Sequence, residues 1–471
     1  MKVLGVYAGH DANLALVEGG RLLRHIEMER VSRSKHFDVR SGERRKLFAS
    51  RVAAAVEGQS PDVIANAGRL WGFKLADLCP EVWSRFADVR GVATEEGELD
   101  GRTVTCVSVP HHVAHIAYTA YIHGVSDAEC ISVDGGGDFA ATVTARLEDG
   151  RIEGLRIRPE CIGQLWSSQA AYRYGDRWAA GTVMAEAALD PVCAELQHLT
   201  EVTLLRIAAE LPHKSDKLVL TCGVALNGLA SMRLAAEAGY ERLVLAPATG
   251  DCGLSIGAAL YAHAHLTGET PPAHDDAQIM YAGRSYDTAG DGADAEGVAR
   301  LLAAGRIVGL YQGRAESGPR ALGNRSILAD PRSRAMHDRL NAEVKHREPF
   351  RPYAPACLAE EATHWFDLAI PSPYMMLIAE ARERCRREAP AAVHLDGTAR
   401  VQTVRRDDNP FLYGIIREFG AITGVPMVLN TSFNRRGEPI VETPQDAVAC
   451  FESTGMDALV LGRRLMEKRK Q

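Results

Sequence analysis

The sequence predicts two α/β domains joined by a short polar linker. The chain has 471 residues, more than a single domain of about 100–200 residues requires. Apolar runs rich in β-branched residues alternate with Ala/Leu-rich runs of helical spacing, a pattern typical of α/β domains. Residues 265–278 are polar, contain two prolines and show no apolar period. We therefore expect domains at 1–265 and 279–471 and a linker at 266–278.

The first domain is expected to open with a β-meander. Three runs with alternating apolar positions are separated by turns that contain glycine: Lys2–Tyr7, Asn13–Val17 and Arg21–Glu27. Further strands are predicted at Thr103–Val109, Cys130–Val133, Leu218–Leu220 and Arg242–Leu245. Helices are predicted at Ala114–Ile122, Val192–Leu211, Ala230–Ala238 and Leu254–Leu266. The second domain is expected to begin with a helix at Glu296–Ala304 and a strand at Ile307–Tyr311, and to close with a strand near Ala458–Gly462.

Composition and charge exclude several classes of function. The formal net charge is −7, so a nucleic acid is not expected as the main partner, because phosphate backbones are bound through Lys/Arg fields. No run of about 18 apolar residues predicts a membrane span, and no cleavable leader is recognised. The ten cysteines form no Cys-x-x-Cys pair, so we expect reduced core residues. The sequence therefore predicts a soluble, cytoplasmic protein.

The sharpest local signal is Pro110-His111-His112-Val113-Ala114-His115. With Pro110 as the first helical residue, His111 and His115 project from one face, whereas His112 points elsewhere. Two imidazoles spaced in this way can bind one metal ion. The alternative is a helix start whose histidines only cap or pack.

Two carboxylates favour the metal interpretation. Asp134 ends a predicted strand and is followed by three glycines, and Asp251 directly precedes a predicted helix. Each alone is equally well explained as a cap or turn former. Together with His111 and His115 they form a two-nitrogen, two-oxygen set. Such a set suits Fe²⁺, Mn²⁺ or Zn²⁺ better than Mg²⁺ or Ca²⁺.

At this point the chain resembles a known family. The motifs Gly9-His10-Asp11-Ala12, His111 to His115, Asp134 to Gly137, Cys222 to Asn227 and the Asp251 loop resemble the N-terminal module of the nodulation, cephamycin and tobramycin O-carbamoyltransferases. That module is Kae1-like: it is similar to the TsaD subunit that threonylcarbamoylates tRNA, in the actin/sugar-kinase/Hsp70 superfamily. The resemblance implies this fold for the first domain.

The second half carries the matching module. Its motifs resemble a YrdC-like, adenylate-forming twisted α/β domain in its carbamoyltransferase version: Glu316 to Ile327, Val344 to Pro352, Asp396 to Gln402 and Leu429 to Asn434. The resemblance implies that ATP and carbamoyl phosphate bind to Arg320, Lys345, Arg351, Arg400, Asn430 and Ser432. Arginine forks hold phosphates and carboxylates well, although most arginines of any chain are solvated surface residues.

The resemblance implies two half-reactions. Carbamoyl phosphate and ATP give carbamoyl adenylate in the second module, with Mg²⁺ compatible with the nucleotide. The labile adenylate passes internally to the first module, where Lys35, Gly223 and Asn227 hold it. Fe²⁺ or another divalent transition metal on His111, His115, Asp134 and Asp251 polarises its oxygens. His10 occupies the position of the general base that deprotonates the acceptor hydroxyl.

The implied acceptor is a small-molecule hydroxyl in natural-product biosynthesis such as antibiotic tailoring, and a homodimer is compatible with the family. One departure is Ala180–Ala187, where relatives carry a Gly-Lys-containing segment. The chain also looks shorter than relatives between Asp134 and Asn227. A tRNA or protein (thio)carbamoylation-type transferase is an alternative, although it favours a basic surface or extra domains. An actin- or kinase-like nucleotide-binding protein without carbamoyl chemistry is another, and it leaves the second module unexplained.

Overall fold

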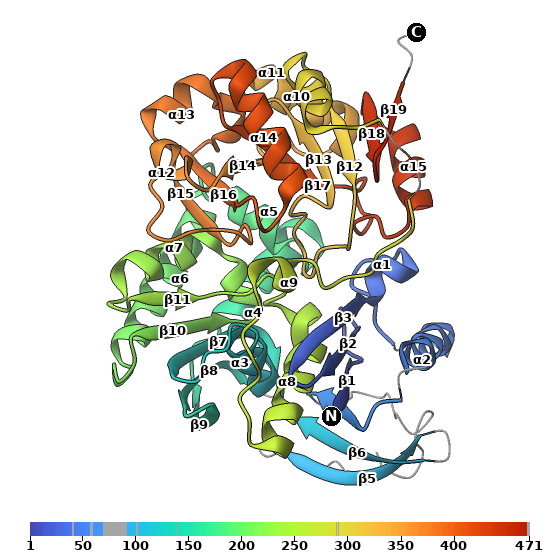
Figure 1. Cartoon of the computed structure of the whole chain (residues 1–471). Helices are drawn as coiled ribbons and strands as arrows, with labels where there is room; N and C mark the ends of the chain where they lie inside the picture. The colour runs from blue at the N-terminus through green and yellow to red at the C-terminus, as the bar shows by residue number, and fades with distance from the viewer. Residues whose placement is uncertain are drawn as a thin grey trace. The chain divides into compact units, whose positions relative to one another are not determined.

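The computed structural model describes residues 1–39, 42–56, 60–68, 92–99, 102–138, 140–288, 290 and 292–468. The chain forms two compact units. Unit 1 comprises Met1–Gln169, Leu205–Leu226 and Ala238–Gly283. Unit 2 comprises Ala170–Leu204, Asn227–Glu237 and Arg284–Gln471. Each unit is described separately below, with the element labels of Figure 1.

Unit 1 begins with a six-stranded sheet in the order β3-β2-β1-β4-β6-β5. The predicted meander is confirmed, because β1 (Lys2–Tyr7), β2 (Asn13–Glu18) and β3 (Arg21–Glu27) pair antiparallel. β4 (Val63–Ala67) and β6 (Arg102–Val109) then add in parallel to β1, and β5 (Ala93–Leu99) closes the edge antiparallel to β6. Two short helices follow the meander, α1 (Met28–Ser32) and α2 (Gly42–Val56).

The second sheet of unit 1 repeats this arrangement, in the order β11-β10-β7-β8-β9. Its antiparallel part comprises β7 (Ala128–Gly137), β8 (Ala140–Glu148) and β9 (Arg151–Arg158). Its parallel part adds β10 (Lys217–Thr221) and β11 (Arg242–Val244) to β7. Both sheets of unit 1 thus consist of an antiparallel meander extended by parallel strands.

Two buried helices pack between the sheets of unit 1, α3 (His111–Tyr121) and α8 (Leu254–Thr267) (Figure 1). α8 lies against β1, β2 and β4, and α3 lies against β7 and β10. The helices approach closely because α8 carries glycine at their contact: a Cβ on Gly257 would lie 1.8 Å from the carbonyl oxygen of Ala114. This contact places the N-termini of both helices near the ends of β7 and β10. α4 (Ile162–Tyr174) follows β9, and α9 (Asp276–Met280) ends the unit.

Unit 2 contains an eight-stranded mixed sheet in the order β15-β16-β14-β17-β13-β12-β18-β19. Its strands are β12 (Val308–Tyr311), β13 (Arg325–Ala329), β14 (Ala354–Leu358), β15 (Leu377–Glu380), β16 (Thr398–Val404), β17 (Met427–Ser432), β18 (Ala458–Leu461) and β19 (Arg464–Glu467). The predicted closing strand matches β18, and β19 was not predicted.

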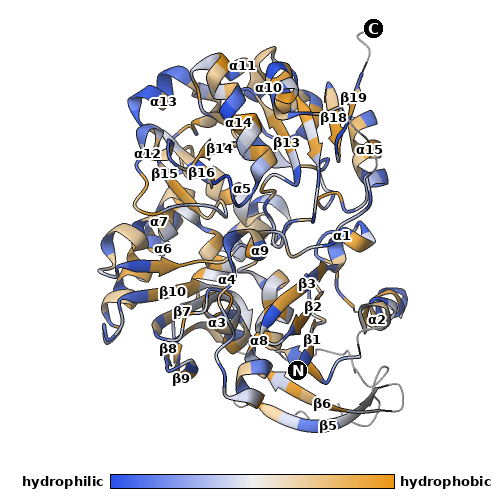
Figure 2. Ribbon diagram, viewed as in Figure 1, coloured by the Kyte–Doolittle hydropathy of each residue, from blue (hydrophilic) through white to orange (hydrophobic). Residues whose placement is uncertain are grey.

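Helices surround the sheet of unit 2. α10 (Ala295–Ala303) packs on α14 (Pro410–Thr423), and α15 (Pro444–Glu452) packs on β12 and β18. Further helices are α5 (Ala180–Ala185), α6 (Pro191–Ala209), α7 (Gly228–Glu237), α11 (Arg334–Arg339), α12 (Ala362–Trp365) and α13 (Glu383–Glu388). A π-helical turn, η5 (Leu340–Lys345), follows α11. Figure 2 shows apolar residues concentrated on inner strands such as β1 and β13.

The boundaries differ from the simple division expected from sequence. Residues 170–204 and 227–237 belong to unit 2, although they precede the expected linker. α7 joins unit 2 because it packs on β15, where a Cβ on Gly228 would lie 2.7 Å from Ile378. The expected linker at 266–278 contains the start of α9, whose Asp275 forms a capping box with Gln278. Two prolines and polar composition therefore did not exclude ordered structure here.

The fold class is confirmed: both units are α/β, and the first has the actin/sugar-kinase-like architecture with two related sheets. Within the described residues, none of the helices combines the length and apolar character that crossing a membrane would need. The nine described cysteines are free thiols, and seven of them are buried, as expected; Cys79 lies outside the described residues.

Candidate metal centre and cationic site

The N-terminus of α3 places two histidines in the interior of unit 1. Pro110 precedes the helix as its N-cap rather than as the first helical residue, so the helix starts one residue later than expected. His111 and His115 are both buried, and their Nε2 atoms lie 3.1 Å apart. His112 points away, as predicted, with its ring nitrogens 2.8 Å from Ser132 Oγ and 3.1 Å from the Ala140 carbonyl oxygen.

The two predicted carboxylates converge on these imidazoles. His111 Nε2 lies 2.9 Å from Asp134 Oδ2 and 3.7 Å from Asp251 Oδ1. His115 Nε2 lies 3.3 Å from Asp251 Oδ1. Tetrahedral ligands bound at 2.0–2.1 Å lie about 3.3 Å apart. The four donor atoms therefore already have spacings near those that one transition-metal ion requires.

Local structure explains this convergence. Asp138 accepts the backbone N–H of His111 at 2.6 Å, which anchors the start of α3 and favours its dipole. Gly137 leaves room for the imidazole, because a Cβ at this position would lie 2.1 Å from His111 Cδ2. The glycines after Asp134 thus give His111 space in unit 1. The sequence analysis had assigned them only to a turn that exposes amides.

Asp251 is held from the first sheet. The Tyr7 hydroxyl donates to Asp251 Oδ2 at 2.6 Å. Asn13 Nδ2 donates to the Asp251 carbonyl oxygen at 2.9 Å, and Asn13 Oδ1 accepts the Ser255 N–H at 3.0 Å. Both residues belong to the β1–β2 hairpin, so the meander fixes the loop that carries Asp251. Tyr7 and Asn13 were not predicted as site residues.

His10 borders the same cluster. Its Nε2 lies 3.3 Å from Asp251 Oδ2, and its Nδ1 lies 3.0 Å from Asp11 Oδ2. Asp11 also approaches a second imidazole, with Oδ1 2.8 Å from His36 Nδ1. Asp11 and His36 both adopt left-handed backbone conformations, with φ of 60° and 49°. Asp11 therefore bridges His10 and His36, a relation that sequence reasoning missed although Asp11 follows His10 directly.

The charges of this cluster are strongly coupled. Burial alone lowers the pKa of His111, but the Asp251 and Asp134 carboxylates outweigh it and raise that pKa to about 9. Burial likewise opposes charge on His10, and Asp251 and Asp11 raise its pKa to about 9. Burial raises the pKa of Asp251, but the neighbouring histidines, His10 first, outweigh it and hold that pKa well below its usual range. The site thus balances negative carboxylates against positive imidazoles.

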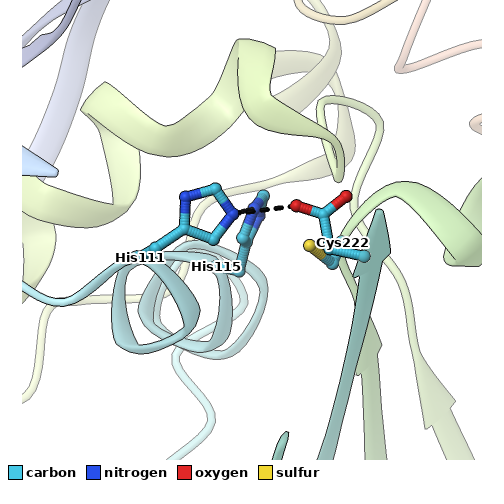
Figure 3. Close-up of side chains that lie close together, drawn as sticks. His111, His115 and Cys222 are labelled. Atoms are coloured by element: carbon cyan, nitrogen blue, oxygen red, sulfur yellow. Dashed lines mark hydrogen bonds and ion pairs between the residues drawn. The ribbon is translucent and has the colours of Figure 1, made fainter. Parts of the chain in front are cut away.

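Cys222 is a fifth buried side chain at the cluster. Its thiol, the imidazoles of His111 and His115 and the Asp134 carboxylate offer donor atoms that all lie within 4.8 Å of one another. Figure 3 shows Cys222 facing the two imidazoles. Burial, together with the Asp134 and Asp251 carboxylates, raises the pKa of the thiol well above its usual value. The sequence analysis had assigned Cys222 to the core.

The three positions expected to hold the adenylate are differently placed. Gly223 adjoins the cluster, since a Cβ on it would lie 3.2 Å from Asp134 Oδ1. Lys35 is exposed, one residue before His36. Asn227 belongs to unit 2 and is buried, where its amide exchanges two hydrogen bonds with Gln197, at 2.8 and 3.1 Å. Its side chain also accepts the Ala230 N–H and so caps α7, which gives Asn227 a structural role.

Unit 2 gathers the predicted arginines into a cationic cluster. Burial, followed by the charges of Arg320, Arg347 and Arg351, lowers the pKa of Arg400 well below its usual value. Burial and Arg347 lower the pKa of Arg351 to about 10. The Nε atoms of Arg320 and Arg400 are buried and find no hydrogen-bond partner among the described residues. A cluster of this kind has unused donors for an anion.

Arg347 was not predicted and has structural contacts of its own. Its Nε donates to Asn341 Oδ1 at 3.0 Å, and its guanidinium lies 4.5 Å from the centre of the Tyr353 ring. These contacts tie the loop after η5 to the start of β14. Arg347 thus supports the segment that carries Lys345 and Arg351.

Lys345 and Ser432 form a second polar group in unit 2. Lys345 Nζ lies 2.6 Å from Asn434 Oδ1, 2.8 Å from the Ser432 carbonyl oxygen and 3.2 Å from Ser432 Oγ. Asn430 links β17 to the arginine loop, because its Nδ2 donates to the Ala321 carbonyl oxygen at 3.2 Å. Asn430 Oδ1 is buried without a partner in the described part of the chain. Asn434 belongs to this group, although it was quoted only as part of a motif.

The divergent segment 180–187 also reaches the cationic cluster. It forms α5 and the turn after it, and Thr182 accepts a hydrogen bond from Arg351. Here a neutral hydroxyl meets the guanidinium within unit 2. The departure from the family pattern therefore affects the surroundings of Arg351.

Comparisons with known proteins agree with these two sites. Family models described as Carbamoyltransferase N-terminus and Carbamoyltransferase C-terminus match residues 171–260 and 299–468. The nodulation protein NolNO of Sinorhizobium fredii is 31% identical over 553 aligned positions, which cover 98% of this chain and 79% of that protein. The 3'-hydroxymethylcephem-O-carbamoyltransferase of Amycolatopsis lactamdurans is 35% identical over 269 positions, 54% of this chain and 50% of that enzyme.

Other comparisons are more partial. The chain spans about half the length of most of the first curated relatives that it matches. A solved structure of full-length HypF in the phosphate- and nucleotide-bound form is 12% identical, with a TM-score of 0.39 over 58% of this chain and 47% of that one.

Proposed function

Because the chain belongs to the carbamoyltransferase family that includes NolNO, we propose that it transfers a carbamoyl group from carbamoyl phosphate, through carbamoyl adenylate formed with ATP, to a hydroxyl of a small molecule. The observation that carries this proposal is the pair of unlike sites. Unit 2 holds a buried cluster of cations with unused donors. Unit 1 holds a buried histidine and carboxylate set spaced for a metal.

The adenylate-forming step belongs to unit 2. Carbamoyl phosphate, ATP and one water give carbamoyl adenylate, pyrophosphate and orthophosphate. Every participant carries phosphate charge, and Arg320, Arg351 and Arg400 repel one another until an anion binds between them. Lys345 and Ser432 add donors from η5 and β17. Binding of the substrates thus relieves a repulsion that the fold maintains.

The transfer step belongs to unit 1. The acceptor hydroxyl attacks the carbamoyl carbon of carbamoyl adenylate, and the products are the carbamate ester, AMP and one proton. A divalent metal bound by His111, His115, Asp134 and Asp251 would supply Lewis-acid polarisation of the carbamoyl or phosphate oxygens. His10 takes the proton, because it is part-exposed and adjoins the cluster at Asp251. Asp11 orients that imidazole through Nδ1.

A small-molecule acceptor is favoured over tRNA. The cephem relative bears a name that specifies a hydroxymethyl acceptor on a small molecule. The net charge of −7 offers little for a polyanionic acceptor. Transfer to tRNA or protein remains the second candidate, and an acceptor screen separates the two.

The test follows both half-reactions in the purified chain. With Fe²⁺, ATP, carbamoyl phosphate and a panel of hydroxylated antibiotics, nucleosides and tRNA, we expect pyrophosphate release and a carbamoylated small molecule by mass spectrometry. Absence of carbamoyl-phosphate-dependent ATP turnover overturns the proposal. Carbamoylation of tRNA alone transfers support to the second candidate.

Variants assign the two steps. Arg351→Ala should abolish adenylate formation, whereas His10→Ala should retain it and slow transfer by about 10²–10⁴-fold. Arg417→Ala is the matched control, because Arg417 is an exposed residue paired with Glu418. Loss of both half-reactions in folded His10→Ala contradicts the assignment of roles.

A further inference from the structure

We infer that Cys222 supplies a sulfur ligand to the metal centre of unit 1, so that the ion is held by imidazole, carboxylate and thiolate donors together. The inference rests on the metal centre of the proposed function, and it goes beyond the two-nitrogen, two-oxygen set expected from sequence. It concerns a residue that no motif of the sequence analysis assigned to the site.

Strand pairing brings Cys222 to the metal centre. β10 runs parallel to β7, and Thr221 pairs with Ser132. Asp134 lies two residues beyond Ser132, and Cys222 directly follows Thr221. The two side chains thus leave the same edge of the sheet, next to the N-terminus of α3.

Distances allow Cys222 to share an ion with its neighbours. Its Sγ and the donor atoms of His111, His115 and Asp134 lie within 4.8 Å of one another. A sulfur at 2.3 Å and a nitrogen at about 2.1 Å from one ion are at most about 4.4 Å apart. Shifts of only a few tenths of an ångström therefore complete the set. Figure 3 shows the thiol directed toward the imidazoles from the opposite side of the site.

The backbone at Cys222 is held in a conformation that side chains rarely adopt. Its φ is +79°, in the left-handed region that favours glycine. Such a residue costs on the order of 1–3 kcal/mol and persists where its surroundings or its role require it. The fully buried thiol is the only part of Cys222 that glycine would not provide. A sulfur ligand gives that side chain a function.

A thiolate changes which metals the centre prefers. Coordination replaces the thiol proton by the metal ion and releases the proton to solvent. Sulfur is a softer donor than carboxylate oxygen, so the ranking shifts toward Zn²⁺ and Fe²⁺ and away from Mn²⁺. Cobalt(II) reports the same ligand, because a cobalt–thiolate bond absorbs strongly in the near ultraviolet.

The test loads the full-length chain with Co²⁺ in the absence of ATP, carbamoyl phosphate and acceptor. The intact chain should show thiolate-to-cobalt absorption, which Cys222→Gly removes while cobalt remains bound more weakly. Glycine suits the backbone at this position, so the variant is expected to fold. Cys252→Ser is the matched control: it removes the thiol that follows Asp251, a residue outside the group of gathered donors, and should keep the band.

Two results overturn the inference. One is cobalt bound to the intact chain without the band, and the other is a band that survives in Cys222→Gly. A second measurement compares metals: the ratio of Zn²⁺ to Mn²⁺ affinity should fall at least about tenfold in Cys222→Gly, by analogy with the 10–100-fold effects of weaker outer contacts. An unchanged ratio also contradicts the inference. These readouts require no turnover, so the sulfur ligand can be established even if the proposed reaction fails.

Discussion

At the scale of single residues, Asp251 organises the first site. Its carboxylate contacts His10, His115 and the Tyr7 hydroxyl at 2.6 to 3.3 Å, while Asn13 fixes its backbone. One side chain thus connects the β1–β2 hairpin, α3 and the start of α8. The metal ligands and the expected general base share this one anchor.

Asp11 offers the sharpest test of how His10 is oriented. Asp11→Asn keeps the shape of the side chain but removes the charge that fixes the His10 tautomer. We expect adenylate formation to be retained and transfer to fall by at least about tenfold. An acceptor with an acidic hydroxyl should recover most of the loss, because it needs less help from a base. Equal losses with acidic and ordinary acceptors indicate a structural role only.

The histidines also predict how stability of the metal-free chain depends on pH. The folded-state pKa values of His10 and His111 are about 9, above the ordinary value of 6.5. Their contribution to stability is therefore complete below pH 6.5 and lost as pH rises toward 9. Thermal unfolding in chelator should show a falling melting temperature across this window. The slope should be smaller in His111→Asn, and an equal slope or a rising melting temperature contradicts the pKa shifts.

Residue types and spacing predicted the metal set better than its surroundings. His111 and His115 were found because one helical turn separates them, and Asp134 and Asp251 because each ends or begins an element. Asp11, Tyr7 and Cys222 were missed because their roles depend on which strand pairs with which. The position of Asn227 in a motif did not reveal that Gln197 occupies its amide.

At the scale of elements, close packing of α3 on α8 positions the histidines. Gly257→Ala would place a methyl group 1.8 Å from the Ala114 carbonyl oxygen, a backbone atom that cannot rotate away. We expect a loss of about 1–3 kcal/mol in the free energy of unfolding, measured by urea titration, and weaker metal binding.

Gly181→Ala is the control for this prediction, because nothing lies within 4 Å of a Cβ at this helical position. It should be neutral or stabilising by about 0.5–1 kcal/mol. If Gly257→Ala is as stable as this control, the helix contact does not position the site in the way described.

Element types were predicted more reliably than element ends. The three meander strands and α8 were predicted nearly to the residue, because alternation and helical period are strong there. β19 was missed because only four residues form it, and three of them point partly or fully to solvent. The helix α9 was missed because its capping box lies inside a segment whose prolines indicated a linker.

At the scale of the whole molecule, an anion should stabilise unit 2. Buried guanidiniums repel one another there, so phosphate or carbamoyl phosphate should raise the melting temperature, by about 2.7 kcal/mol at 100 times Kd. Arg400→Met should raise the anion-free melting temperature and remove most of the response. Arg417→Met, at an exposed ion pair, should keep the response. A full response in Arg400→Met places the anion elsewhere.

The division of the chain was the hardest feature to read from sequence. Composition located one break near residue 270, and the last crossing into unit 2 does follow Gly283. Residues 170–204 and 227–237 join unit 2 through packing such as that of Gly228 on Ile378, which no local pattern announces. Family motifs identified both modules because they preserve chemistry in chain order rather than contacts.

The central claim is that this chain activates carbamoyl phosphate with ATP, and phosphorus NMR of the purified protein tests it most directly. With both substrates present, we expect pyrophosphate and orthophosphate to form in equal amounts, and neither product when carbamoyl phosphate is omitted. Arg400→Ala should prevent both. Formation of ADP and orthophosphate irrespective of carbamoyl phosphate, or no reaction with both substrates and Fe²⁺ present, would contradict the account.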